Sequence, residues 1–278
     1  MNDNAPQADG PVLPRHACLP INRCNLPARI LGSLTFQRHP SPLAIDGVAE
    51  LHRDLFGALD RIAEAAARAR RFMDYMTVHF RLEHLDEAGL DGAAPRQRGK
   101  ANYLRLLRGW AFDSDSREGA VLKGWAESRF GLLPRFHREP MRDFSGAGYR
   151  AYLEERAAGL YGTNALESQV DLLYTYCQYE LSRSPQAAHV LLYRGANRLC
   201  EHEVLSPPGA RAPVLLLNNL NSFSATRERA GEFGDRIAAV RVPLAKVFYR
   251  TGLLPGVLSG EDEYVVIGGL YQTESVGT

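Results

Sequence analysis

Apolar residues recur with a helical period through most of the first 185 residues. Between residues 46 and 80 they follow one another at steps of three and four: Val48, Leu51, Leu55, Leu59, Ile62, Ala66, Ala69, Met73, Met76 and Phe80. This spacing places them on one face of a helix. We therefore expect one continuous amphipathic helix over 46–80, with Asp46 as its N-cap.

A basic cluster lies within this segment. Arg68, Arg70 and Arg71 come close together between the apolar positions. The default interpretation is a solvated helix face, and the alternative is a docking surface for an acidic partner.

The same period predicts further helices over 102–110, 120–130, 149–158 and 166–181. Gly159 would end the third of these, and Asn164 with Glu167 forms a capping-box pattern before the fourth. Trp110 and Trp125 fall within the first two, and we assign both to the core rather than to a cofactor site. Residues 84–100 and 134–145 are predicted loops. Residues 16–40 are expected to form an irregular, partly extended arm, and residues 1–15 a disordered tail.

After residue 185 the pattern changes to short strand-like runs separated by turn residues. Strands are expected at 189–194, 213–220, 237–242, 246–250 and 263–271. We predict an α+β fold, in which a mainly helical part (16–185) packs on an antiparallel β-rich core (186–278). With no long flexible linker between them, the two parts are expected to form a single domain over 16–278.

Composition narrows the functional classes. The 278 residues are 45% hydrophobic and 23% charged, and the formal net charge is +1. This balance gives no indication of nucleic-acid or anionic-membrane binding. The sequence has no apolar run long enough for a transmembrane helix. Its first residues lack a signal-peptide pattern, so we expect a cytoplasmic protein.

Several common sites have no sequence signature here. Cys18, Cys24, Cys177 and Cys200 are not spaced as a zinc site or a disulfide framework, so they are interpreted as free thiols. No metal site is predicted. The sequence also lacks the glycine-rich phosphate loops of P-loop NTPases and Rossmann dehydrogenases.

The most informative stretch is 259–267, in which Glu261 and Glu263 precede an apolar run. In a strand, residues two apart share a face, so both carboxylates would point into the same space. Such a pair is kept mainly where a cation or a reaction requires it. The alternative is a solvated strand end.

Two upstream strands carry matching groups. The run 189–195 ends in Arg194 and Gly195; an arginine there can bind phosphate oxygens, and the glycine lets a ligand approach the backbone. The run 214–224 ends in amides and in Ser222, Phe223 and Ser224. Taken separately, the first segment is better explained as a surface arginine before a turn, and the second as a polar turn after a core strand.

The order of these motifs resembles the Arg-Ser-Glu class of mono-ADP-ribosyltransferases. Phe223 stands where that class usually has threonine in its Ser-Thr-Ser motif. The segments 22–27, 31–37, 104–110 and 172–180 extend the likeness. Over about residues 16–271, the chain resembles the dinitrogenase reductase ADP-ribosyltransferase family. The resemblance implies the ADP-ribosyltransferase type of β core.

The resemblance implies NAD as co-substrate and a protein arginine as acceptor. Glu263 would be the catalytic glutamate, stabilising the positive charge that develops on the ribose. Glu261 would orient the acceptor guanidinium and help to remove its proton. Ser222 would hold Glu263 in place.

The remaining implied roles concern binding and partners. Arg194 would hold phosphate or ribose oxygens of NAD, and the Gly195 backbone its carboxamide. Phe223 would stack on the nicotinamide or belong to the core. The implied acceptor is dinitrogenase reductase, whose modification shuts off nitrogen fixation, and the implied regulator is a PII-type signal-transduction protein. The alternatives are an arginine-specific transferase with another acceptor and a non-catalytic regulatory protein on the same fold.

Overall fold

The computed structural model describes residues 10–83, 101–183, 188–196, 203–207, 209–258 and 262–277. The predicted loop 84–100 and Cys200 lie outside these residues, as do the first nine residues of the predicted tail. Leu13, within the predicted tail, is buried. The packed chain therefore begins before the predicted boundary at residue 16.

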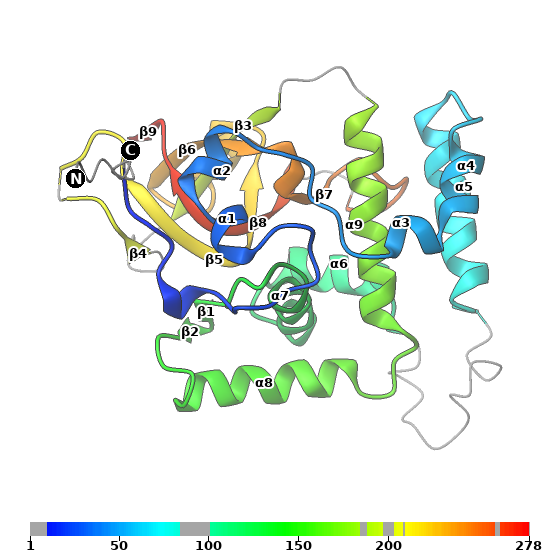
Figure 1. Cartoon of the computed structure of the whole chain (residues 1–278), viewed down its shortest axis with the longest axis horizontal. Helices are drawn as coiled ribbons and strands as arrows, with labels where there is room; N and C mark the ends of the chain where they lie inside the picture. Colours follow the sequence, from blue (N-terminus) through cyan, green and yellow to red (C-terminus); the bar gives the residue numbers. More distant parts are fainter. Residues whose placement is uncertain are drawn as a thin grey trace, which may run out of the picture.

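From residue 189 onward, the chain forms an antiparallel sheet (Figure 1). In the described part of the chain, its central path runs β7-β8-β5-β3-β6-β9, and β4 pairs with β5. The strands are β3 (His189–Ala196), β4 (Glu203–Val204), β5 (Val214–Ser224), β6 (Arg236–Pro243), β7 (Val247–Arg250), β8 (Glu263–Gln272) and β9 (Ser275–Gly277). Strands β5 and β8 are almost wholly buried, because helices and other strands cover both of their faces.

Helices make up most of the chain before the sheet. They are η1 (Arg15–Ala17), α1 (Ala28–Leu31), α2 (Leu34–Arg38), α3 (Val48–Leu51), α4 (Arg53–Leu59), α5 (Ala65–His79), α6 (Tyr103–Phe112), α7 (Arg117–Phe130), α8 (Ala147–Leu160) and α9 (Leu166–Ser182). A short hairpin of β1 (Phe136–His137) and β2 (Glu139–Pro140) follows α7. Along the chain, helix α10 (Arg227–Gly231) connects β5 to β6, and η3 (Leu244–Lys246) connects β6 to β7. The predicted α+β class is confirmed.

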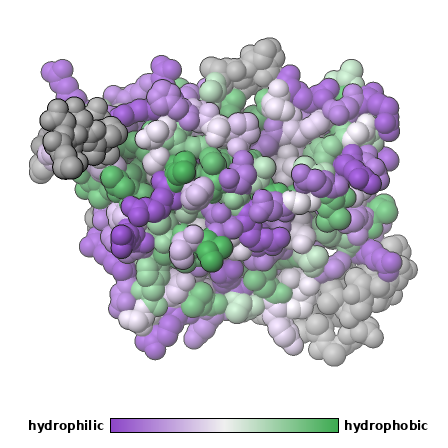
Figure 2. Space-filling model, in the orientation of Figure 1, coloured by the Kyte–Doolittle hydropathy of each residue, from purple (hydrophilic) through white to green (hydrophobic). Residues whose placement is uncertain are grey.

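The helices enclose the sheet from several sides. Helices α1 and α2 lie over it in Figure 1, α7 lies between the sheet and α8, and α9 separates it from α4 and α5. Figure 2 shows hydrophilic and hydrophobic residues interspersed on the face viewed. Among its coloured atoms no large continuous apolar patch stands out, so this face does not indicate an apolar docking site.

The predicted helix over 46–80 is wrong in its continuity. The chain forms α3, α4 and α5, with breaks at His52 and at residues 60–64. Gly47, at a φ of 77°, is the N-cap of α3 in place of Asp46. The apolar pattern is kept only in part: Leu55, Ala69 and Met76 are buried, whereas Leu51 is 74% exposed and Ala66 is also exposed.

Arg68 is also not on a solvated face. It is buried and donates to both carboxylate oxygens of Glu180 on α9, each at 2.7 Å. It also donates to the carbonyls of Ile62 and Ala63 at 2.9 and 2.6 Å. Arg68 therefore satisfies the backbone at the break before α5 and joins α5 to α9, whereas Arg70 and Arg71 are exposed as predicted.

Both predicted signals around α8 and α9 fail. Gly159 lies inside α8, where a Cβ atom would come within 2.4 Å of Val121 Cγ2, so it permits close packing of α8 on α7. The N-cap of α9 is Ala165, and the side chain of Asn164 donates instead to the carbonyl of Phe80. Tertiary packing determines both features.

The arm over 16–40 is more regular than predicted and packs on the sheet as expected. It contains η1, α1 and α2, and Ser33 caps α2 by accepting from Phe36 N at 3.1 Å. The side-chain amide of Gln37 accepts from the backbone N–H of Gln272 on β8 at 2.7 Å and donates to the carbonyl of the same residue at 3.0 Å. The arm is thereby attached directly to the sheet.

A buried ion pair joins α7 to α9. Arg129 donates to Asp171 through Nε at 2.8 Å and Nη2 at 2.9 Å, and the indole of Trp125 donates to the same carboxylate at 2.7 Å. Removing one partner of a buried pair leaves an uncompensated charge. We expect Asp171→Ala to lower the free energy of unfolding by about 3 kcal/mol.

Denaturant unfolding measures this change. Asp60→Ala is the matched control, because it removes a carboxylate from the largely exposed pair with Arg183, where the contribution is small. Equal losses in the two variants would contradict the importance of the buried pair.

Candidate active site

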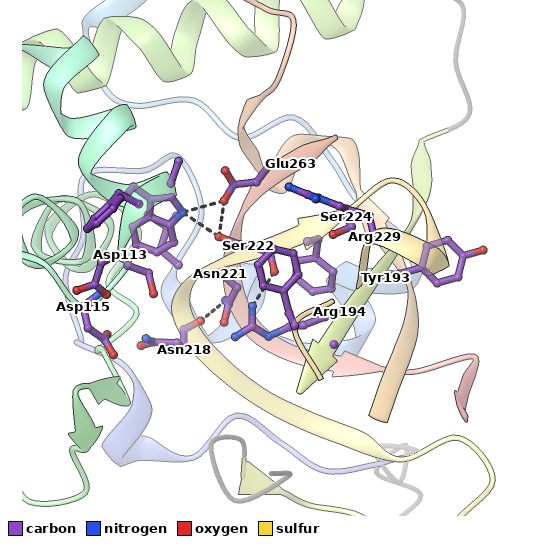
Figure 3. Close-up of a pocket in the computed structure, with 18 of the residues that line it drawn as sticks. Asp113, Asp115, Tyr193, Arg194, Asn218, Asn221, Ser222, Ser224, Arg229 and Glu263 are labelled. Carbon is purple, nitrogen blue, oxygen red and sulfur yellow. Dashed lines mark hydrogen bonds between the residues drawn. The ribbon is translucent and has the colours of Figure 1, made fainter. Parts of the chain in front are cut away.

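A cavity of about 510 Å³ lies where the helical part meets the sheet. Strands β3, β5 and β8 supply Arg194, Ser222 and Glu263 to its lining. The turn after α6 supplies Asp113 and Asp115, which lie across from Arg194 in Figure 3. The volume and mixed polar lining are those of a small-molecule site.

Ser222 and Glu263 are brought together by strand register. Glu263 pairs with Ser224 across β5 and β8, and Ser222 pairs with Val265. Since residues two apart share a face, Ser222 and Ser224 both lie on the Glu263 side of the sheet. The Ser222 hydroxyl donates to Glu263 Oε1 at 2.5 Å (Figure 3).

A β-bulge in β5 separates its apolar half from this polar half. The register of β5 against β8 shifts between Leu217 and Leu220. Pairing then resumes, and the strand predicted over 213–220 continues through Ser224 instead of ending in a turn. At the bulge, a Cβ atom on Gly268 would lie 1.7 Å from the carbonyl oxygen of Asn218. Glycine is therefore required opposite the bulge, which re-aims the side chains that follow it.

The two bulge asparagines hold the helical part against the cavity. Asn218 accepts from Arg135 N and donates to Phe136 O, both at 2.8 Å. Asn219 donates to Lys123 O at 2.7 Å. These amides satisfy backbone groups that would otherwise be buried without partners.

Arg194 lies on β3, next to β5 in the sheet. Its Nη1 donates to the carbonyl of Ser222 at 2.6 Å, and Tyr193 pairs with Ser224. The guanidinium is thus placed beside the Ser222–Glu263 pair, in the same cavity.

Gly195 is required for a reason that the sequence does not show. A Cβ atom at this position would lie 1.9 Å from the carbonyl oxygen of Ala230 in α10. The absence of a side chain therefore allows α10 to pack on β3. Gly195 also lines the cavity. Its contact with the NAD carboxamide stays a prediction.

Phe223 is placed in the hydrophobic core. Its side chain is 2% exposed, and its ring centroid lies 6.4 Å from that of Tyr271. This burial agrees with the core interpretation, one of the two that the sequence left open. Phe223 also borders the cavity, and its stacking on nicotinamide stays a prediction.

Glu261 lies outside the described residues. The next residue, Asp262, directly precedes β8 and lines the cavity, and its carbonyl accepts from Ala225 N at 3.0 Å. The predicted role of Glu261 stays a prediction.

Sequence reasoning did not assign Trp110 to this site. It is buried, as predicted, but its indole N–H also donates to Ser222 Oγ at 2.9 Å and to Glu263 Oε1 at 3.2 Å. Helical periodicity assigns a tryptophan to the core and gives no sign of a polar partner more than 100 positions away. The available signal was that Trp110 ends one of the segments on which the family resemblance rests.

The helical wall of the cavity contains a buried charged network. Lys123, which is 1% exposed, donates to Asp115 Oδ1 at 2.6 Å, and its Nζ lies 3.2 Å from His137 Nδ1. His137 Nε2 lies 3.0 Å from Glu155 Oε2. Burial lowers the pKa of both Lys123 and His137. These positions fit a neutral imidazole that accepts from Lys123 and donates to Glu155.

Other features bear on what this protein binds. Within the described ranges, no group of three or more metal-binding side chains occurs. None of the described helices is long and apolar enough to cross a membrane. Cys18, Cys24 and Cys177 are free.

Comparison with known proteins identifies the family. The family described as dinitrogenase reductase ADP-ribosyltransferase (DRAT) matches residues 21–275. The chain is 42% identical over 255 residues to the NAD(+)--dinitrogen-reductase ADP-D-ribosyltransferase of Rhodospirillum rubrum. The aligned region covers 90% of this chain and 92% of that protein. No solved structure matches the chain. The resemblance indicated by the sequence motifs is confirmed: the chain belongs to the dinitrogenase reductase ADP-ribosyltransferase family.

Proposed function

We propose that this protein transfers ADP-ribose from NAD to an arginine side chain of dinitrogenase reductase. The observation that carries the proposal is the Ser222–Glu263 pair, bonded at 2.5 Å in the wall of a cavity that Arg194 also lines. Family membership supplies the reaction. The cavity residues fit a dinucleotide. Arg194 offers a cation for phosphate oxygens, and the half-buried carboxylate of Glu263 lies beside it.

The reaction exchanges one bond to the ribose for another. NAD supplies the glycosidic bond to nicotinamide, which leaves with the bonding electrons, and a guanidinium nitrogen of the acceptor forms the new bond. The acceptor loses one proton in this exchange. In such chemistry, positive charge develops on the sugar in the transition state.

Glu263 is the group placed to stabilise that charge. A fixed carboxylate interacts more strongly with a transition state that gains positive charge than with the ground state. The bond from Ser222 holds Oε1 in place, so little reorganisation is needed when the charge develops. Arg194 binds phosphate or ribose oxygens, and Glu261 orients and deprotonates the acceptor guanidinium.

A labelling experiment tests the function. The protein is incubated with labelled NAD, with and without dinitrogenase reductase. Label on the reductase supports the proposal, and label on other proteins only would indicate another acceptor. No consumption of NAD under either condition would indicate a non-catalytic protein on this fold.

Arg194→Ala is expected to weaken NAD binding by about ten- to a hundredfold, because a hydrogen bond to a charged group is lost. Calorimetric titration with NAD measures the dissociation constant. Arg241→Ala is the control, since Arg241 lies on the neighbouring strand β6 and pairs with Glu274 outside the cavity. An unchanged dissociation constant in folded Arg194→Ala would remove Arg194 from the binding site.

The family resemblance further implies a PII-type signal-transduction protein as regulator. We propose this partner on the resemblance alone, and binding of the purified proteins to each other would test it. The cytoplasmic location likewise stays a prediction, which cell fractionation would check.

A further inference from the structure

Trp110 forms a closed hydrogen-bonded triangle with Ser222 and Glu263. Its single indole N–H is shared between Ser222 Oγ at 2.9 Å and Glu263 Oε1 at 3.2 Å, and Ser222 Oγ lies 2.5 Å from the same Oε1. Figure 3 marks the contact between Ser222 and Glu263 with a dashed line. Two donors therefore converge on one carboxylate oxygen.

The indole also fixes the direction of the serine hydroxyl. A hydroxyl carries one hydrogen and rotates to suit its neighbours, whereas an indole N–H can only donate. Because Trp110 donates to the oxygen of Ser222, the hydrogen of that hydroxyl is free to point at Glu263. Linked bonds of this kind polarise and strengthen one another.

Trp110 is itself held by the helical part. Its helix α6 is capped by Asn102, which accepts from Arg105 N at 3.1 Å, and Tyr103 N donates to Gln169 of α9 at 3.0 Å. The Lys123 ammonium lies 6.0 Å from the Trp110 ring centroid, within the range of a cation–π interaction. The indole is therefore anchored by contacts within the helical part in addition to its bonds with Ser222 and Glu263.

We infer that Trp110 is a positioning residue for catalysis: its N–H holds the Ser222 hydroxyl and the Glu263 carboxylate in the orientation in which Glu263 stabilises the developing charge. This inference rests on the proposed function. It assigns the helical part a direct role in the geometry of the catalytic carboxylate.

Trp110→Phe tests the inference, because it keeps an aromatic ring and removes the donor. The turnover number kcat for transfer should fall about ten- to a hundredfold, as expected for the loss of a hydrogen bond to a charged group. The NAD dissociation constant should stay within about threefold, because phenylalanine keeps an aromatic ring in the cavity wall and the lost N–H is directed at Ser222 and Glu263. The acid limb of the kcat profile should move to higher pH, because the charged carboxylate has lost a donor.

Trp125→Phe is the matched control. Trp125 is equally buried and also donates its indole N–H to a carboxylate, that of Asp171, but it does not line the cavity. This variant should lower the unfolding temperature and leave kcat within about twofold. Equal falls in kcat for both variants would overturn the inference and indicate a general effect of core disruption.

A double-mutant cycle shows whether Trp110 acts through Glu263. In the Glu263→Gln background, measured with excess enzyme, adding Trp110→Phe should cause little further loss. A further loss as large as in the wild-type background would overturn the inference. If Trp110→Phe does not fold, Ser222→Ala breaks the same triangle and takes its place in the cycle.

The outcomes separate the inference from the proposed function. A wild-type protein that neither consumes NAD nor labels dinitrogenase reductase would overturn the function. An active wild-type protein whose kcat and pH profile are unchanged by Trp110→Phe would overturn only the role of Trp110.

Discussion

Glu263→Gln is expected to lower the rate of ADP-ribose transfer by on the order of 10² to 10³. The substitution is nearly isosteric and removes the charge that faces the developing cation. An amide can still bond Ser222 and Trp110, so the cavity wall should keep its shape. The transfer rate is measured with labelled NAD and dinitrogenase reductase at saturating NAD.

Two further measurements show that the loss is chemical. The NAD dissociation constant and the unfolding temperature should both stay close to those of the wild type. Glu274→Gln is the control, because this glutamate pairs with Arg241 at the surface and neither residue lines the cavity. Transfer by Glu263→Gln within tenfold of wild type would exclude Glu263 as the catalytic glutamate.

The strand part of the site could be predicted from the sequence because it depends on local rules. Alternation of side chains along a strand predicted that Glu261 and Glu263 share a face. The order of the motifs and the family resemblance that it carries then assigned roles to Ser222 and Glu263. Their register then follows from the pairing of β5 with β8. The bulge was not predictable, because it depends on the close approach of Gly268 to the backbone of Asn218.

The helical part was less predictable because its details depend on contacts between distant residues. Helical periodicity continues through 46–80, yet the chain breaks before α5, where Arg68 reaches Glu180 on α9. Trp110 has a partner 153 positions away in Glu263. An apolar pattern records that a residue is buried but not which polar group it meets, so both contacts required the three-dimensional structure.

Glu261→Gln is expected to remove transfer to the acceptor arginine while NAD hydrolysis stays measurable. Breaking the glycosidic bond and capturing the sugar are separate tasks, and we assign the first to Glu263 and the second to Glu261. Hydrolysis of NAD does not need this carboxylate, because water has no guanidinium to be oriented or deprotonated. General-base assistance contributes on the order of 10² to 10⁴, so transfer should fall by at least about a hundredfold.

The ratio of two products measured in one tube decides this division of labour. Free nicotinamide counts every NAD molecule cleaved, and labelled dinitrogenase reductase counts only those transferred. Asp262→Asn is the matched control, since Asp262 is an exposed carboxylate between the two glutamates and also lines the cavity. If Asp262→Asn changed the ratio as much as Glu261→Gln, the effect would belong to the negative charge of this segment and not to one placed base. If Glu261→Gln reduced both products in equal proportion, Glu261 would act on NAD cleavage itself, and the acceptor arginine would have to lose its proton to another group.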